Sequence, residues 1–309
     1  MLSKYKLVII LLIGIIPMVS FSQSVPYFKS KGILDSLETK FRKKYTLIDY
    51  SIKVTDPKTK KELVVKTHYF QNTKEVKCPL LILVPPIKGV SMREKKVAKH
   101  FIEKGYHVIV IEPIKNISDY TIPISEFENN LLSFVGAVRS VIDVMEMRPE
   151  IQNENMFLWG SSMGAIYSSI VICEDDRLNA SALILGGAPI ADVVTESNQK
   201  YIVNYRNERM KQENLSSLEE FRAKMKENMT IDPLILAENS DSVKVYICIA
   251  TKDKTVPTKY QRQLLKAFDV GTDYNDYKMG HATLLMQSHL FQISEYSNFF
   301  GRNMKKAVN

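Results

Sequence analysis

The chain has 309 residues, of which 45% are hydrophobic and 25% charged, and its formal net charge is +8. These proportions are typical of globular proteins and exclude a disordered or fibrous chain. Three cysteines are too few for a disulfide scaffold. The basic residues are scattered and lack interleaved aromatic residues, so we predict no nucleic-acid partner and only a loose attraction to membrane surfaces.

The first 22 residues have the pattern of a secretory signal peptide. Lys4 and Lys6 precede the apolar run 7–19, and a short serine-containing stretch ends at Ser22. We therefore expect residues 1–22 to direct the chain into the periplasm, the cell envelope or the medium. The alternative is an uncleaved membrane anchor, although the run is shorter than the roughly 20 residues that a spanning helix needs.

Residues 23–309 are expected to form one domain that opens with an antiparallel hairpin, because apolar and polar residues alternate in its first two strands. From residue 80 onward, short apolar strands alternate with amphipathic helices, which predicts βαβ units in a mostly parallel sheet. The fold class is therefore α/β, with a sheet of about eight strands and helices on both faces. The expected strands are 48–54, 63–70, 80–84, 107–111, 156–159, 182–185, 243–250 and 274–278, and the expected helices are 91–104, 127–145, 163–173, 260–268 and 283–300.

One connection is much longer than the others. Residues 191–241 are polar, charged and helical in propensity, and they are too many for a simple link between a strand and a helix. We expect them to form a small helical cap insertion over a pocket at the ends of the strands. The alternative is a surface excursion that touches no site.

The clearest chemical motif is Gly160-Ser161-Ser162-Met163-Gly164, which follows an apolar strand and opens a helix. It matches the pattern G-x-S-x-G with Ser162 at its centre. The sharp turn between strand and helix needs small residues two positions to either side, which Gly160 and Gly164 provide. We predict that Ser162 is a nucleophile at the top of the sheet, at a helix N-terminus that favours negative charge.

A serine nucleophile needs a base, and the base needs a carboxylate that orients it. Among five histidines, His281 follows the last expected strand and precedes the last helix, where this kind of sheet delivers its base. Asp253 leaves the strand 243–250 and comes between Ser162 and His281 in the order that this arrangement requires. Asp192, one strand earlier, is the alternative acid. The other histidines fall inside strands or helices, which favours packing or surface roles.

The oxyanion that forms on attack needs two N–H donors. Met163, directly after the nucleophile, is expected to provide one of them. The other should come from the loop after the strand 80–84, where Pro85 and Pro86 have no N–H. Ile87 is therefore the first available donor.

These motifs resemble the α/β-hydrolase superfamily, in particular its single-domain dienelactone-hydrolase-like and prolyl-oligopeptidase-like branch. The resemblance covers roughly residues 63–300 and rests on the loop 84–89, the turn at Ser162, Asp253 with Val256-Pro257, and Gly280-His281. It implies acyl transfer to water through an acyl-enzyme. Two features depart from the pattern: Pro85-Pro86 stand where many members have His-Gly, and the nucleophile is a serine rather than the cysteine of a dienelactone hydrolase.

The expected function is a serine hydrolase of carboxylic esters, with amide, peptide or thioester bonds open to the same triad. Its substrate would be a small-molecule or peptide acyl compound. The alternatives are an acyltransferase on the same triad and a non-catalytic binding protein on a hydrolase scaffold. No metal motif, dinucleotide fingerprint or P-loop occurs, so we expect no cofactor and no metal. Oligomeric state, acyl-chain length and natural substrate stay open at this point.

Overall fold

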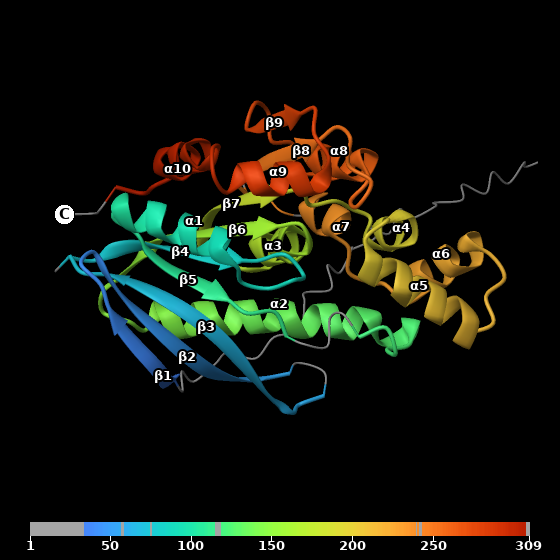
Figure 1. The fold of residues 1–309 in the computed structure, drawn as a ribbon, viewed down its shortest axis with the longest axis horizontal. Coiled ribbons are helices and arrows are strands. Elements are labelled where there is room, and N and C mark those ends of the chain that lie inside the picture. The colour runs from blue at the N-terminus through green and yellow to red at the C-terminus, as the bar shows by residue number, and fades with distance from the viewer. Residues whose placement is uncertain are drawn as a thin grey trace, which may run out of the picture.

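The computed structural model describes residues 34–56, 59–74, 76–114, 119–238, 240 and 243–306. The expected signal peptide, residues 1–22, lies outside the described residues, so export from the cytoplasm stays a prediction. The described chain forms one nine-stranded sheet with helices on both of its faces (Figure 1). No helix in these ranges combines the length and the apolar character that a membrane crossing requires.

The sheet has the order β1-β2-β3-β5-β4-β6-β7-β8-β9. Strands β1, β2, β3 and β5 pair antiparallel in succession, and all pairs from β5 onward are parallel. This confirms the predicted α/β class with its antiparallel N-terminal hairpin. The strands are β1 (Leu34–Phe41), β2 (Tyr45–Thr55), β3 (Glu62–Asn72), β4 (Cys78–Val84), β5 (His107–Ile111), β6 (Ile151–Ser161), β7 (Leu178–Ile184), β8 (Val245–Ala250) and β9 (Tyr274–Tyr277).

Strand β1 was not predicted, and it accounts for the ninth strand where about eight were expected. It is an edge strand whose apolar residues Leu37 and Phe41 are exposed. Its register with β2 also shifts between Ser36 and Glu38, which interrupts the alternation of a regular strand. An edge strand with a bulge therefore lacks the periodic signal by which the other strands were found.

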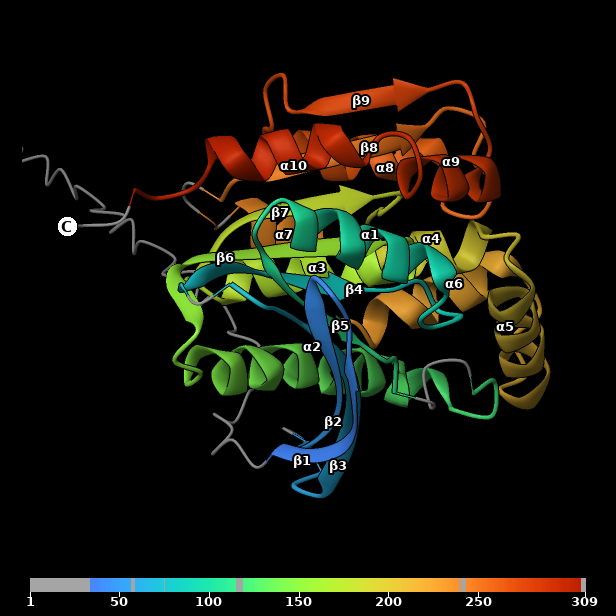
Figure 2. The same ribbon diagram turned by 60° about the vertical axis from the view of Figure 1, so that its left-hand side comes forward.

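Two hydrophobic clusters lie on opposite faces of the sheet. Helices α1, α9 and α10 pack on one face, and α2, α3, α8 and the helices of the insertion pack on the other. Figure 2 shows β1, β2 and β3 curling away from the parallel strands and past α2, with which β2 is in contact. The helices of the two faces are α1 (Met92–Glu103), α2 (Ile124–Glu146), α3 (Met163–Glu174), α8 (Thr258–Ala267), α9 (His281–Ser288) and α10 (Ile293–Arg302).

The last helix was predicted as one segment, 283–300, and the structure corrects this to two, α9 and α10. The chain turns at His289, whose ring is buried and bonds through Nδ1 to the carbonyl of Leu285 at 2.7 Å. Apolar residues on both sides of the turn face the same cluster. The hydrophobic pattern therefore continues across the break, and no glycine or proline marks it.

The long connection forms four helices, α4 (Ile190–Glu196), α5 (Lys200–Gln212), α6 (Leu218–Glu227) and α7 (Pro233–Glu238). Figure 1 shows α4, α5 and α6 at the end of the molecule toward which the parallel strands run. Ile202, Phe221 and Met225 of these helices belong to the same hydrophobic cluster as the body of the domain. The insertion is thus packed against the body at the end of the sheet where the predicted nucleophile lies.

Candidate active site

Ser162 occupies the turn between β6 and α3. Its backbone has φ +56° and ψ −120°, a left-handed conformation that a residue other than glycine adopts only under constraint. The constraint is visible in the backbone, because the amide of Ser162 donates to the carbonyl of Ile184 on the neighbouring strand at 2.7 Å. This is the strained elbow that the sequence predicts at this position.

The two glycines of the motif permit close approaches that no side chain would allow. A Cβ at Gly160 would collide with the carbonyl oxygen of Gly164 and lie 2.5 Å from Oγ of Ser168. A Cβ at Gly164 would collide with the carbonyl oxygen of Val84 and lie 2.5 Å from that of Pro85. Gly164 therefore lets helix α3 begin directly against the loop that follows β4, and Gly160 lets the end of β6 pack against the first turns of α3.

The structure brings the three predicted catalytic side chains into one hydrogen-bonded chain. Nε2 of His281 lies 2.9 Å from Oγ of Ser162, and Nδ1 of the same ring lies 2.7 Å from Oδ2 of Asp253. Because a carboxylate only accepts, the short contact requires Nδ1 to carry the proton. The lone pair of Nε2 then faces the serine hydroxyl, the arrangement in which histidine can act as a general base.

Asp253 is buried, and its carboxylate is fully hydrogen-bonded. Oδ1 accepts from the backbone amides of Thr255 and Val256 at 2.7 and 3.0 Å. Oδ2 accepts from Nε2 of Gln261 at 2.8 Å in addition to the histidine. Gln261 is itself completely buried, donates to the carbonyl of Val256 and accepts from the amide of Ala250. The sequence analysis missed Gln261, although a polar residue between Tyr260 and Leu264 on the buried face of α8 is a weak signal of such a role.

The alternative acid, Asp192, does not reach His281. It lies on α4, where its two carboxylate oxygens pair with Arg222 and Lys226 of α6, each at 3.0 Å. Asp192 therefore holds two helices of the insertion together. Its place after β7 suggested a catalytic role because the carboxyl ends of β7 and β8 are neighbours in the sheet.

A small cavity opens beside Ser162, and both predicted oxyanion donors line it. It has a volume of about 30 Å³, and Ile87 and Met163 contribute to its wall together with the nucleophile. Within the described part of the chain, the backbone amides of Ile87 and Met163 donate to no carbonyl. Two unengaged N–H groups beside a nucleophile are what stabilisation of an oxyanion requires.

A second serine and histidine meet directly beneath the elbow. Oγ of Ser161 accepts from Nε1 of Trp159 at 3.0 Å and lies 3.2 Å from Nε2 of His289. Both residues are almost fully buried, and burial lowers the pKa of His289, which favours the neutral form of its ring. Neither side chain lines the cavity at Ser162. This pair therefore packs the elbow against the end of α9 and is closed to substrates.

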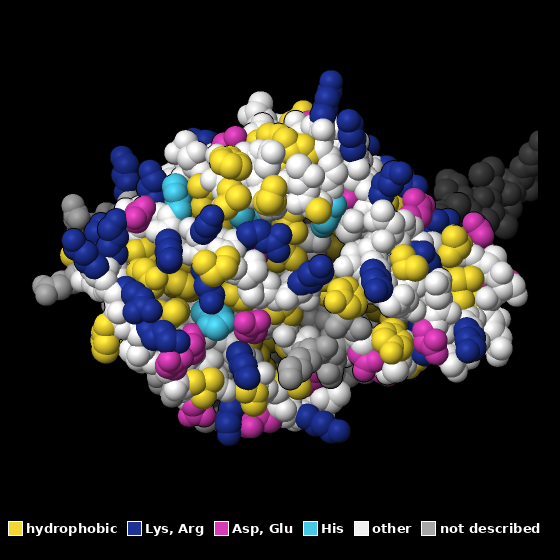
Figure 3. All heavy atoms as spheres, viewed as in Figure 1, with side chains coloured by type: hydrophobic (Ala, Val, Ile, Leu, Met, Phe, Trp, Pro, Cys, Tyr) yellow, Lys and Arg dark blue, Asp and Glu magenta, His cyan; other side chains and the backbone are white. Residues whose placement is uncertain are grey.

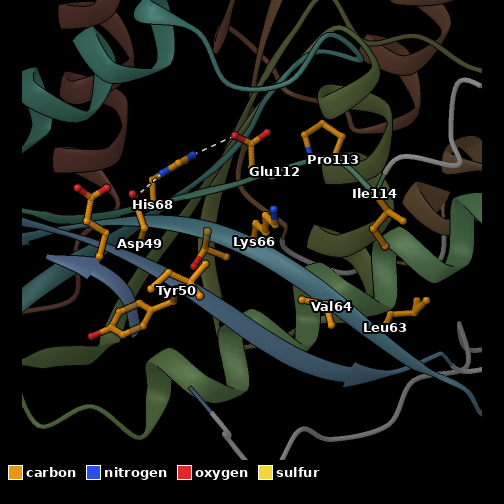
Figure 4. Close-up of a pocket in the computed structure, with 12 residues that line it drawn as sticks. Asp49, Tyr50, Leu63, Val64, Lys66, His68, Glu112, Pro113 and Ile114 are labelled. Atoms are coloured by element: carbon orange, nitrogen blue, oxygen red, sulfur yellow. Dashed lines mark hydrogen bonds and ion pairs between the residues drawn. The ribbon is translucent and has the colours of Figure 1, made fainter. Parts of the chain in front are cut away.

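A much larger hollow lies elsewhere, at the antiparallel end of the sheet. It measures about 900 Å³ and is lined by residues of β1, β2, β3 and the segment after β5. Figure 4 shows His68 in its wall between two carboxylates, with Nδ1 2.6 Å from Asp49 and Nε2 2.9 Å from Glu112. The hydrogen bond to Glu112 raises the pKa of His68 above its ordinary value. Ser162 is not among the lining residues, so this hollow is separate from the candidate active site.

One face of the molecule carries mixed charges. Figure 3 shows lysine and arginine side chains spread among acidic ones over this face, without a single basic patch. The described part of this face has no long stripe of positive charge. The basic residues, which are scattered along the sequence, are therefore also scattered over this face of the molecule.

Comparison with known proteins adds to this picture through structure alone. No protein-family model matches the sequence, and no curated protein matches it. The acetyl xylan esterase from Paenibacillus sp. R4 superposes with a TM-score of 0.68 over 89% of this chain and 90% of its own, at 13% identity. Acetyl xylan esterase 1 from Thermoanaerobacterium sp. JW/SL YS485 gives 0.64 over 87% and 89%, at 14% identity. The acylaminoacyl peptidase from Pyrococcus horikoshii gives 0.57 over 90% of this chain and 51% of its own, at 13% identity.

The chain has the α/β-hydrolase fold. This confirms the resemblance at the level of the fold, which is as far as likeness at 13% or 14% identity extends. In this chain the α/β-hydrolase fold brings together the turn after β6, the loop after β8 and the first residue of α9, which follows β9. Parallel strands end at one edge of a sheet, and ligands of open α/β sheets bind at that edge.

Proposed function

We propose that the protein is a serine hydrolase of carboxylic esters, in which Ser162 is the nucleophile, His281 the general base and Asp253 the acid that orients it. The observation that carries this proposal is the hydrogen-bonded chain from Ser162 through His281 to Asp253, beside a cavity with two unengaged backbone amides. The esterases among the structural neighbours support ester hydrolysis.

In the proposed reaction, His281 Nε2 takes the hydroxyl proton of Ser162 while Oγ attacks the ester carbonyl carbon. The carbonyl oxygen becomes an oxyanion that the amides of Met163 and Ile87 stabilise, each contributing about 2.7–4 kcal/mol in the transition state. The carbon–oxygen bond to the alcohol then breaks, and His281 returns the proton to the leaving alkoxide. A water molecule, activated by the same histidine, attacks the acyl-enzyme and releases the acid and free Ser162.

The test compares two adjacent serines, each of which contacts a histidine. Residues 23–309 are assayed with p-nitrophenyl acetate and with a fluorophosphonate probe that labels activated serines, alongside Ser162→Ala and Ser161→Ala. We expect Ser162→Ala to abolish both labelling and turnover, and Ser161→Ala to retain both, because Ser161 is sealed from solvent. A folded parent protein that is neither labelled nor active would favour the non-catalytic scaffold, and labelling that survives Ser162→Ala would reject this serine as the nucleophile.

A further inference from the structure

The cavity beside Ser162 is small and apolar. Its volume of about 30 Å³ is far below the roughly 300–1,000 Å³ of a site that holds a drug-sized ligand. The body of the domain contributes Ile87, Ser162, Met163, Ile166, Thr255 and Val256 to its wall, and the insertion contributes Ile190, Val193, Val194, Ser197, Gln199 and Ile202. None of these residues is charged, so the space suits an uncharged group of one or two carbon atoms beyond the carbonyl.

A second small cavity adjoins the first, with which it shares two lining residues. It measures about 20 Å³ and is lined mainly by aromatic and aliphatic side chains, among them Phe127, Tyr167 and Tyr205. Met163 and Ile202 line both cavities. These two side chains therefore form the wall that separates the space at the nucleophile from the apolar space beyond it.

Of these two residues, Ile202 is the one that can be substituted without touching the catalytic machinery, because the backbone of Met163 also carries a proposed oxyanion donor. Ile202 lies near the start of α5 in the insertion and is 9% exposed. Its side chain belongs to the hydrophobic cluster that joins insertion and body, so it is held in place by packing. A longer acyl chain would have to displace this side chain to enter the second cavity.

We infer that the substrate is an ester of a short, uncharged acid, of acetyl or propionyl size, and that Ile202 of the insertion sets this limit. The inference rests on the proposed function and adds to it the class of acyl group. The insertion thereby acts as part of the acyl site, as a cap over the pocket would.

The first measurement is the chain-length profile of the parent protein. kcat/KM is determined for p-nitrophenyl acetate, butyrate and octanoate, and fluorophosphonate labelling is recorded in parallel. We expect kcat/KM to fall by about tenfold or more between acetate and octanoate, as steric exclusion of methylene groups commonly produces. Labelling combined with equal or faster turnover of octanoate would overturn this inference alone. Absence of both labelling and turnover would overturn the proposed function, and the inference with it.

The second measurement removes the wall. Ile202→Ala joins the two cavities, so the ratio of kcat/KM for octanoate to that for acetate should rise by about tenfold. The matched control is Ile231→Ala, which truncates a buried isoleucine of the same insertion that lines neither cavity. It should lower stability and leave the ratio unchanged. An unchanged ratio in folded, labelled Ile202→Ala, or an equal change in the control, would show that Ile202 does not limit the acyl chain.

Discussion

At the scale of single residues, the site depends on space as much as on functional groups. Gly164 allows α3 to begin against the carbonyls of Val84 and Pro85, in the loop that also carries Ile87. Gly164→Ala should therefore push this loop away, lower fluorophosphonate labelling strongly and reduce the free energy of unfolding by about 1–3 kcal/mol. The matched control is Gly301→Ala in α10, where an added methyl group meets no atom within 4 Å. Full labelling of Gly164→Ala would contradict the close packing described here.

The roles of the two candidate acids, Asp253 and Asp192, can be distinguished by neutralising one carboxylate at a time. Asp253→Asn replaces the acceptor of the histidine proton, so kcat should fall by about a thousandfold or more while the fold persists. Asp192→Asn loses ion pairs to Arg222 and Lys226, and should leave kcat within about threefold. Steady-state kinetics with p-nitrophenyl acetate and urea unfolding of both variants provide the comparison. A large loss of kcat in Asp192→Asn would reverse the assignment.

The sequence could predict these residues only where chemistry and chain order coincide. Ser162 and His281 each follow a strand and precede a helix, and Asp253 lies between them, so local pattern and global order agree. Gln261 neither belongs to a motif nor follows a strand. Its residue type alone does not show that this glutamine is buried in α8 and bonds to Asp253. The contact of Ser161 with His289 also depends on a turn between two helices that the hydrophobic pattern does not reveal.

At the scale of elements, a histidine joins the antiparallel hairpin to the rest of the sheet. His68 on β3 contacts Asp49 on β2 and Glu112 after β5 (Figure 4). Lys66 and Glu38 also line this hollow. A neutral imidazole has only one N–H, so it can donate to only one of the two carboxylates. The protonated ring donates to both. The attachment of the hairpin should therefore depend on pH.

The raised pKa of His68 fixes the sign of this dependence. A group with a raised pKa in the folded state stabilises the fold fully below its unfolded value of about 6.5, and this contribution disappears as the pH rises through the folded value. The hydrogen bond from His68 lowers the pKa of Glu112. The stability that Glu112 contributes to the fold is therefore present above its ordinary pKa of 4.5 and is lost as the pH falls from there through the lowered value. The cluster of Asp49, His68 and Glu112 therefore stabilises the fold most between the ordinary pKa of Glu112, 4.5, and that of His68, 6.5.

Urea unfolding of the parent protein and of His68→Gln from about pH 6 to about pH 9 tests this. The difference between their free energies of unfolding should shrink as the pH rises. His100→Gln is a control of opposite sign, because burial lowers the pKa of His100 and favours its neutral form. A difference between parent and His68→Gln that stays constant over the whole range would show that the charge on His68 does not hold the hairpin.

At the scale of the whole molecule, the alternation of strands and helices made the fold class predictable, since buried parallel strands appear as continuous apolar runs. The sheet order is not encoded locally. Strand β5 lies between β3 and β4, and the chain then passes β4 through α2 to reach β6, so the strand order follows from connection handedness and packing. The role of residues 191–241 was also open in the sequence. Their contact with the cavity depends on tertiary packing of Ile202 and its neighbours, which no periodicity in the segment records.

The shared hydrophobic cluster also predicts how the molecule unfolds. Residues of the insertion and of the body form one cluster on one face of the sheet, whereas Trp159, the single tryptophan, lies in the cluster on the other face. Because both clusters pack against the same strands, insertion and body should unfold together. The urea midpoints for Trp159 fluorescence, helical circular dichroism and loss of fluorophosphonate labelling should therefore coincide. Loss of labelling at a clearly lower urea concentration than the change in Trp159 fluorescence would instead mean that the insertion opens as a separate unit while the sheet stays folded.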